Sequence, residues 1–190
     1  MLDHIASNRT QEKVERLAQA TGIRPASNRV VAELSDVIFI CVRPLEVRDV
    51  LSDISHLLNS DKLVVSVAGD VTLEKLQALC PARVARAFPS MASQKLQGVT
   101  LLAFRDRAAT EDRRLIADLF HAIGHAETAE EKDFAVLAYL TSCAPGYFAG
   151  LISSVATVGG ITEAGGRSSG ARRRACSTSS SRQQKPGTIR

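Results

Sequence analysis

The stretch Asp36–Pro44, DVIFICVRP, decides the fold of this chain. Its apolar run, residues 37–42, is too short for a membrane span and lacks the alternation of a strand with one wet face. Such a run is typical of a strand buried on both faces inside a parallel sheet. Arg43-Pro44 ends the strand, because proline cannot continue a central ladder but fits the first turn of a helix. We therefore expect Arg43 at the carboxyl end of the strand, where α/β folds bind ligands.

The residues after this strand predict an amphipathic helix, which completes a strand–turn–helix unit. Its apolar positions recur at helical spacing: Val47, Val50, Leu51, Ile54, Leu57 and Leu58. Further strands are predicted at 4–7, 23–26, 62–68, 83–88, 99–104 and 125–127. Helices are predicted after Thr10, after Ser27, over 71–79, and after Thr110, where Leu115, Ile116, Leu119 and Phe120 would be buried. The alternation indicates a doubly wound α/β sheet.

A long helix is predicted from Glu130 to about Val158. The pattern Thr128-x-x-Glu131 favours a capping box at its start. Residues 143–146, Cys-Ala-Pro-Gly, are expected to interrupt it, because proline removes a backbone donor and kinks a helix. We expect this helix to begin an all-helical domain.

Length and composition exclude several classes of protein. The 190 residues have room for one domain and part of a second, and 45% of them are apolar. No apolar run reaches the length of a membrane span, and the first ten residues lack the layout of a signal peptide. The cysteines form no C-x-x-C pair and lack metal-ligand spacing with the histidines: Cys41, Cys80, Cys143 and Cys176. We therefore expect reduced thiols, no metal site and a cytoplasmic location.

The basic charge of the chain is concentrated at its end. Seven of the 24 basic residues and none of the 20 acidic ones follow Glu163, so the rest carries a net charge of −3. Residues 165–190 are rich in Arg, Ser and Gly and predict a disordered tail. This tail has three interpretations: an arm for nucleic acid or an acidic partner, a solvated tail, or the product of a frameshift or truncated gene. We favour the third, since low complexity follows an apolar helix without a linker and no aromatic residue interleaves the arginines.

Asn8-Arg9-Thr10 place an amide, a guanidinium and a hydroxyl between a strand and a helix that Thr10 would cap and Gly22 would close. In dinucleotide-binding folds an acid at the end of the second strand selects NAD, whereas an arginine accommodates the 2′-phosphate of NADP. Arginine without an acid favours NADP. The plainer alternatives stay open: a capped surface turn here, a solvated strand end at Arg43 and a harmless kink at Pro145.

Together the motifs resemble a known family. In order they are NRT, SN, VVAELSDVIFICVRPLEV, VVSVAG with VTLEKL, VARAFPSMA and LTSCAPGYF. This series, from about Asn8 to about Ser154, resembles pyrroline-5-carboxylate reductase, and it looks closer still to the reductase-like protein of bacterial late-competence operons. The resemblance implies a Rossmann-like doubly wound sheet followed by the start of an all-helical dimerisation domain.

The resemblance also implies site residues. Those implied for NADP are Asn8, Arg9, Thr10, Asn28, Val42, Arg43, Pro44, Ala68 and Gly69. The first three match the segment that holds the 2′-phosphate, and the last two lie on the nicotinamide side. The substrate pocket corresponds to Thr141 and Ser142, as candidate catalytic contacts, with Cys143, Ala144 and Pro145 as substrate-binding residues.

The chain departs from the family pattern at several points. Pro89-Ser90-Met91-Ala92 stands where the family has Pro-Asn-x-Pro, so an amide near the nicotinamide is lost. Ser142 and Ala144 replace glycines, so side chains stand where the family's backbone approaches a substrate carboxylate. Residues 159–162, Gly-Gly-Ile-Thr, follow the pocket helix too soon to be the family's substrate loop. The first strand and its Gly-rich phosphate loop are expected to be missing.

The expected function follows from the resemblance. The family reduces a cyclic imine, Δ1-pyrroline-5-carboxylate, to L-proline with NADPH in proline biosynthesis, as a homodimer or higher oligomer. The expected organisation is an incomplete NADP-binding domain over 1–128, the first helix of a truncated helical domain over 129–164, and the tail. Two alternatives stay open: a non-catalytic, reductase-derived protein in competence or regulation, and an inactive gene fragment.

Overall fold

The computed structural model describes residues 4–105 and 108–159. The chain divides into two compact units, 1–150 and 151–190. All the described strands belong to the first unit, and the described part of the second is the end of one helix. The predictions for residues 160–162 and for the tail, 165–190, lie outside the described residues.

Strands and helices alternate along the first unit. The strands are β1 (Ile5–Ala6), β2 (Arg24–Pro25), β3 (Val37–Ile40), β4 (Leu63–Ser66), β5 (Arg83–Pro89), β6 (Gly98–Phe104) and β7 (Gly124–Thr128). The helices are α1 (Gln11–Thr21), α2 (Asn28–Leu34), α3 (Val47–Ile54), α4 (Leu73–Leu79), α5 (Thr110–His121), α6 (Phe134–Ala138) and α7 (Ala144–Val158). Every predicted strand is present; β1 to β4 are shorter than predicted, and β5 to β7 are one or two residues longer.

The strands form two sheets. β1 pairs with β2 in parallel, and the five-stranded sheet has the order β3-β4-β5-β6-β7. The pairs β3–β4, β4–β5 and β6–β7 are parallel, whereas β5 and β6 are antiparallel. Among the described residues no strand joins β1 to β3. In the doubly wound order 3-2-1-4-5-6 one strand lies between the strands that correspond to these two.

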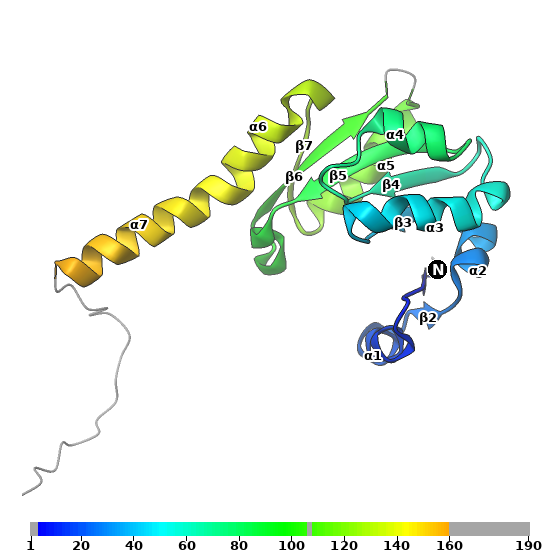
Figure 1. Ribbon diagram of the computed structural model, residues 1–190, viewed down its shortest axis with the longest axis horizontal. Helices are drawn as coiled ribbons and strands as arrows, with labels where there is room; N and C mark the ends of the chain where they lie inside the picture. Colours follow the sequence, from blue (N-terminus) through cyan, green and yellow to red (C-terminus); the bar gives the residue numbers. More distant parts are fainter. Residues whose placement is uncertain (1–3, 106–107, 160–190) are drawn as a thin grey trace, which may run out of the picture. The chain divides into compact units, whose positions relative to one another are not determined.

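Helices cover both faces of the five-stranded sheet, as a doubly wound fold requires (Figure 1). One face packs Val64 of β4 against the α3 and α4 residues Leu51 and Leu76. The other face packs Val65 of β4 against Ile116 of α5. β4 is thus buried on both faces, which explains its continuous apolar sequence. The sheet and its two apolar layers confirm the predicted fold class.

β3 is less buried than its sequence predicts. Ile38 and Ile40 are buried, but Phe39 on the opposite face is 40% exposed and makes an edge contact with the Phe120 ring. β3 is the end strand of its sheet, so the helix on that face covers it only in part. The prediction of burial on both faces was wrong for this strand for that reason.

Two other predictions about burial and capping were wrong. Leu115 and Leu119 of α5 are more than 40% exposed, because the buried side of this helix is the line of Asp112, Ile116 and Phe120. Thr128 makes no capping box. It is the last residue of β7 and pairs with Leu102 in the sheet.

Polar contacts at the ends of α1 also differ in part from the prediction. Thr10 is at the N-cap position but makes no side-chain capping bond. Its backbone N–H instead donates to Asn8 Oδ1 at 2.9 Å. Gly22 closes the helix in the left-handed conformation with φ +75°, as predicted.

The long helix runs from Glu131 to Val158 and is interrupted earlier than predicted. Residues Tyr139–Cys143 form a π-helical turn, and the backbone N–H of Ala144 donates to the carbonyl of Tyr139. Pro145 follows inside the first turn of α7. The interruption is therefore a widened turn just before the proline rather than a break at 143–146, and π-turns of this kind are frequent at functional sites.

Candidate functional site

The cofactor residues implied by the family lie in loops that follow strands or open helices. Asn8, Arg9 and Thr10 follow β1, and Asn28 is the first residue of α2. Arg43 and its neighbours follow β3, and Ala68 and Gly69 follow β4. β3 and β4 are parallel neighbours, so the loops after them share one edge of the sheet. This edge is where doubly wound folds bind nucleotides.

The Arg43 segment is a strand-to-helix turn. Pro44 opens a short 3₁₀ helix, Pro44–Glu46, and Arg43 occupies its N-cap. The Glu46 carboxylate reaches back to the start of the turn, where Oε2 accepts the backbone N–H of Arg43 at 3.2 Å. Proline suits this place because its missing N–H has no partner in a first turn.

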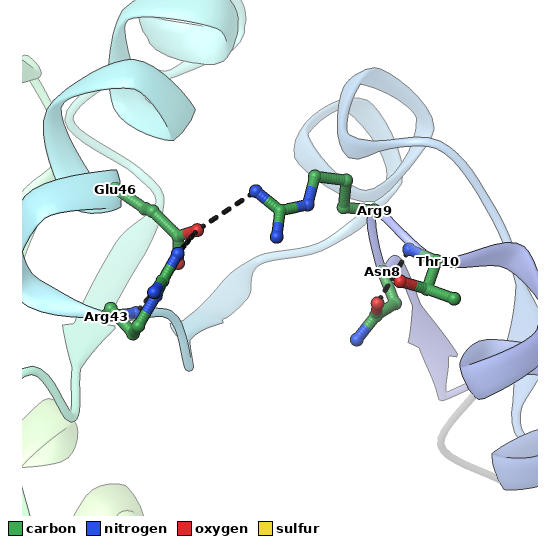
Figure 2. A network of polar contacts seen from close by, with 5 residues as sticks. All are labelled: Asn8, Arg9, Thr10, Arg43 and Glu46. Atoms are coloured by element: carbon green, nitrogen blue, oxygen red, sulfur yellow. Dashed lines mark hydrogen bonds and ion pairs between the residues drawn. The ribbon is translucent and has the colours of Figure 1, made fainter.

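Glu46 also joins two segments that are distant in sequence (Figure 2). Its Oε1 accepts Arg43 Nη2 at 2.7 Å and Arg9 Nη1 at 3.2 Å. The bonds from Arg43 and the charge of Arg9 lower the pKa of Glu46 to about 2. The bond with Glu46 in turn raises the pKa of Arg43. Two guanidinium groups thus face one ionised carboxylate, and the cluster carries a net positive charge.

A buried arginine holds the loop that follows β4. Arg86 lies in β5 with a side chain 6% exposed, and its Nη2 donates to the carbonyl of Gly69. Its Nη1 donates to Glu131 Oε1 at 2.6 Å, and its guanidinium stacks 4.6 Å from the Phe134 ring centroid. Glu131 Oε1 also accepts the backbone N–H of Leu73 at 2.7 Å. One ion pair thus ties the Gly69 loop and the start of α4 to the start of the long helix.

The residues implied for substrate lie on the π-turn and the first turn of α7. Thr141 Oγ1 donates to the carbonyl of Leu137 at 2.9 Å, so its hydroxyl proton is used within the helix. Ser142 Oγ is buried and has no hydrogen-bond partner within the described residues. Cys143, Ala144 and Pro145 continue the helix without a break. Burying a hydroxyl without a hydrogen-bond partner costs free energy. Ser142 is therefore the strongest candidate among these residues for a contact with a ligand.

The structure brings together only some of the implied residues. Arg9 and Arg43 meet through Glu46, and Asn8 bonds to Thr10. Within the described residues no hydrogen bond or ion pair links residues 141–145 to the cofactor loops. No cluster of metal-ligating side chains occurs in the described part of the chain.

Sequence reasoning missed three residues at this site: Glu46, Arg86 and Glu131. A signal existed for each. Glu46 stands three residues after the N-cap, the position from which an acid can bond back to it. Arg86 interrupts an apolar strand, and a buried charge requires a partner. Glu131 was assigned to a cap although it is the partner of Arg86.

Comparison with known proteins identifies relatives of this chain. A family model described as NADP oxidoreductase, coenzyme F420-dependent, matches residues 4–70. ComE operon protein 4 of Bacillus subtilis is 29% identical over 149 residues, which are 77% of this chain and 54% of that protein. The pyrroline-5-carboxylate reductase of Escherichia coli is 33% identical over 159 residues, 80% of this chain and 59% of that enzyme. The chain belongs to the pyrroline-5-carboxylate reductase family.

Solved structures of the family share this fold. The pyrroline-5-carboxylate reductase of Coxiella burnetii has a TM-score of 0.77 at 22% identity, covering 82% of this chain and 60% of that one. The Plasmodium falciparum enzyme, solved with NADP bound, has a TM-score of 0.70 at 22% identity, covering 82% and 57%. The chain spans about half the length of the curated relatives it matches. It is therefore a member of a pyridine-nucleotide-dependent oxidoreductase family, represented here by part of the relatives' length.

Proposed function

We propose that this chain forms the cofactor half of an NADPH-dependent reductase that converts Δ1-pyrroline-5-carboxylate to L-proline. The observation that carries the proposal is the meeting of Arg9 and Arg43, from the loops after β1 and β3, at an exposed and positively charged cluster. Guanidinium groups are the usual partners of a nucleotide phosphate. The identity to pyrroline-5-carboxylate reductases supports the reaction class.

The described residues suit both the adenosine end and the nicotinamide end of NADP. The arginines would hold the 2′-phosphate, with Asn8, Thr10 and Asn28 on the adenosine side. Gly69 has no side chain between its backbone and the nicotinamide side, and its carbonyl is fixed by Arg86. NADPH, when bound, supplies a hydride from its nicotinamide C4 to the imine carbon.

The remaining chemistry falls to the substrate residues. Hydride addition leaves a lone pair on the ring nitrogen of the former imine, and this nitrogen takes up one proton to give the amine of proline. Ser142 would orient the substrate through its unpartnered hydroxyl, while Thr141, Cys143, Ala144 and Pro145 line the pocket. The catalytic contribution of the chain is then orientation, since the cofactor carries the reducing power.

Fluorescence titration of the purified chain with NADPH and, separately, with NADH tests the cofactor half. We expect micromolar binding that prefers NADPH. The reaction is tested by imine-dependent consumption of NADPH with proline as the product. A folded chain that binds neither nucleotide would refute the proposal.

A second candidate is a reductase-derived protein that binds NADPH without turning over the imine. The loop after β5 favours it. Ser90 stands where the family has asparagine, is buried, and uses Oγ to accept the backbone N–H of Val99 at 3.1 Å. Its oxygen therefore serves the loop rather than a ligand. The similarity to ComE operon protein 4 also fits this candidate. NADPH binding without imine-dependent oxidation would favour it.

The long helix motivates a proposal about assembly and location. The helix has 28 residues, and an 18-residue window of it has a mean hydropathy of 1.4, enough by length and composition to span a membrane. Within the first unit it exposes large apolar side chains: Val136, Tyr139, Leu140, Tyr147 and Phe148. We propose that a second copy covers them in a cytoplasmic homodimer or higher oligomer. Light scattering of the purified chain and fractionation of cells test this, and recovery in the membrane fraction would refute it.

A further inference from the structure

Glu46 lies where a phosphate would have to bind. Arg9 and Arg43 come from different loops and converge on the same oxygen, Glu46 Oε1, at 3.2 and 2.7 Å (Figure 2). A carboxylate oxygen between two guanidinium groups has the charge and the acceptor geometry of one phosphate oxygen. The two arginines therefore already hold an anion, and the protein supplies it.

We propose that Glu46 is a specificity-determining residue that competes with the 2′-phosphate of the nucleotide for Arg9 and Arg43. The inference rests on the proposed cofactor function. A phosphate monoester that enters the site must take both guanidinium groups from Glu46 and then remain near its negative charge. Glu46 accordingly weakens the binding of 2′-phosphorylated nucleotides and leaves unphosphorylated ones unaffected.

Because Arg9 and Arg43 are exposed, replacing Glu46 by a phosphate as their partner costs little free energy. The side chains of Arg9 and Arg43 are 84% and 75% exposed, so solvent reaches both. Ion pairs between exposed groups are weak because water screens the charges. Each guanidinium has five N–H donors in a planar fork and uses a single N–H for Glu46 Oε1. A phosphate with three oxygens can accept more of these donors than Glu46 does.

Glu46 itself does not leave the site when it loses the arginines. Its side chain is 27% exposed, and Oε2 accepts the backbone N–H of Arg43, which fixes the carboxylate at the start of the turn. The negative charge therefore stays beside the incoming phosphate. This distinguishes a built-in competitor from a flexible surface residue that swings into solvent.

A structural role for the same residue makes a different prediction. Glutamine keeps an oxygen that accepts the Arg43 backbone N–H but removes the charge, whereas alanine removes both. If Glu46 only caps the turn, Glu46→Gln leaves phosphate binding unchanged and Glu46→Ala weakens it. If Glu46 competes with phosphate, both substitutions strengthen phosphate binding.

The test measures the affinity of the full chain for adenosine 2′-monophosphate, inorganic phosphate, NADPH and NADH by calorimetric titration. We expect Glu46→Gln to bind adenosine 2′-monophosphate and NADPH about fivefold more tightly than the wild-type chain, because the pairs it breaks are exposed. NADH affinity stays unchanged. Glu111→Gln, which removes an equal charge from the exposed first turn of α5, is the matched control and behaves as wild type.

The outcomes separate this inference from the proposed function. If adenosine 2′-monophosphate gains affinity in Glu46→Gln but no variant binds NADPH, the inference stands and the cofactor proposal fails. If NADPH binds and Glu46→Gln equals wild type for both 2′-phosphorylated ligands, the inference fails alone. Absence of adenosine 2′-monophosphate binding in every variant also overturns it. An equal gain for inorganic phosphate overturns the assignment to a nucleotide.

Discussion

Two arginine–glutamate clusters in this chain use the same chemical groups in opposite ways. Arg86 and Glu131 join β5 to the long helix, with side chains 6% and 30% exposed. The cluster of Arg9, Arg43 and Glu46 lies at the surface beside the loops after β1 and β3. Burial makes the first cluster a fixed support, because an unpaired charge inside the protein is expensive. Exposure makes the second one exchangeable, which a ligand site for an anion needs.

Removing the carboxylate that pairs with the buried Arg86 should have the largest effect. Glu131→Gln leaves the Arg86 guanidinium buried without a counter-charge, so we expect the free energy of unfolding to fall by about 3 kcal/mol. Chemical denaturation measures it. Glu130→Gln is the matched control: its carboxylate pairs with Lys132 at the surface, and the denaturation midpoint should not move. Equal midpoints for the two variants would show that the two clusters do not differ as described.

Removing an exposed arginine should change the affinity for a ligand more than the stability of the fold. Arg43→Gln takes away one guanidinium from the surface cluster, and we expect affinity for adenosine 2′-monophosphate to fall about fivefold. The denaturation midpoint should fall only slightly, because the Arg43–Glu46 pair is exposed. A clear loss of stability with unchanged affinity would assign the Arg43–Glu46 pair to structure instead.

A smaller change separates the two ends of the proposed cofactor. A Cβ at Gly69 would lie 3.3 Å from the Phe88 ring, so Gly69→Ala shifts the loop that Arg86 holds by a few tenths of an ångström. We expect NADPH affinity to fall about threefold, since a small misplacement of a fitted loop costs roughly 0.7 kcal/mol of binding free energy. Affinity for adenosine 2′-monophosphate should not change. An equal loss for both ligands would contradict the separation.

The smallest expected effect is a pH dependence. The pKa of Glu46 falls from an ordinary 4.5 to about 2 in the folded chain, so its ionised form is favoured by folding. Its stabilising contribution is therefore fully present above pH 4.5 and is lost as the pH falls through 2. The difference in denaturation midpoint between wild type and Glu46→Gln should follow that course. A difference that grows as the pH falls would have the wrong sign.

Sequence patterns predicted the sheet because burial leaves a strong periodic signal. The apolar runs at β3, β4 and β6 and the stripe on α3 each appear where they were expected. The family resemblance, confirmed by the relatives, located the loops around them. Patterns failed where a residue's partner is distant in sequence. The Arg86–Glu131 pair spans 45 positions, and the Arg9–Glu46 bond spans 37.

Local rules also failed where tertiary structure overrode them. Thr128 and Glu131 have capping-box spacing, but Thr128 pairs with Leu102 in the sheet and Glu131 forms an ion pair with Arg86. Leu115 and Leu119 fit a helical stripe, but the buried side of α5 is formed by Asp112, Ile116 and Phe120 instead. In each case two local choices were compatible with the sequence, and packing selected one.

The π-turn at Tyr139–Cys143 works as a phase shift along the long helix. In a regular α-helix, residues eight apart point about 80° away from each other. The widened turn absorbs one residue, so Tyr139 and Tyr147 behave as residues seven apart, with directions only about 20° apart. Their rings accordingly lie on one side, with centroids 6.1 Å apart. One inserted residue thus realigns two aromatic rings, and converting the widened turn into a regular α-helical turn with the residue kept would rotate the later side chains by about 100°.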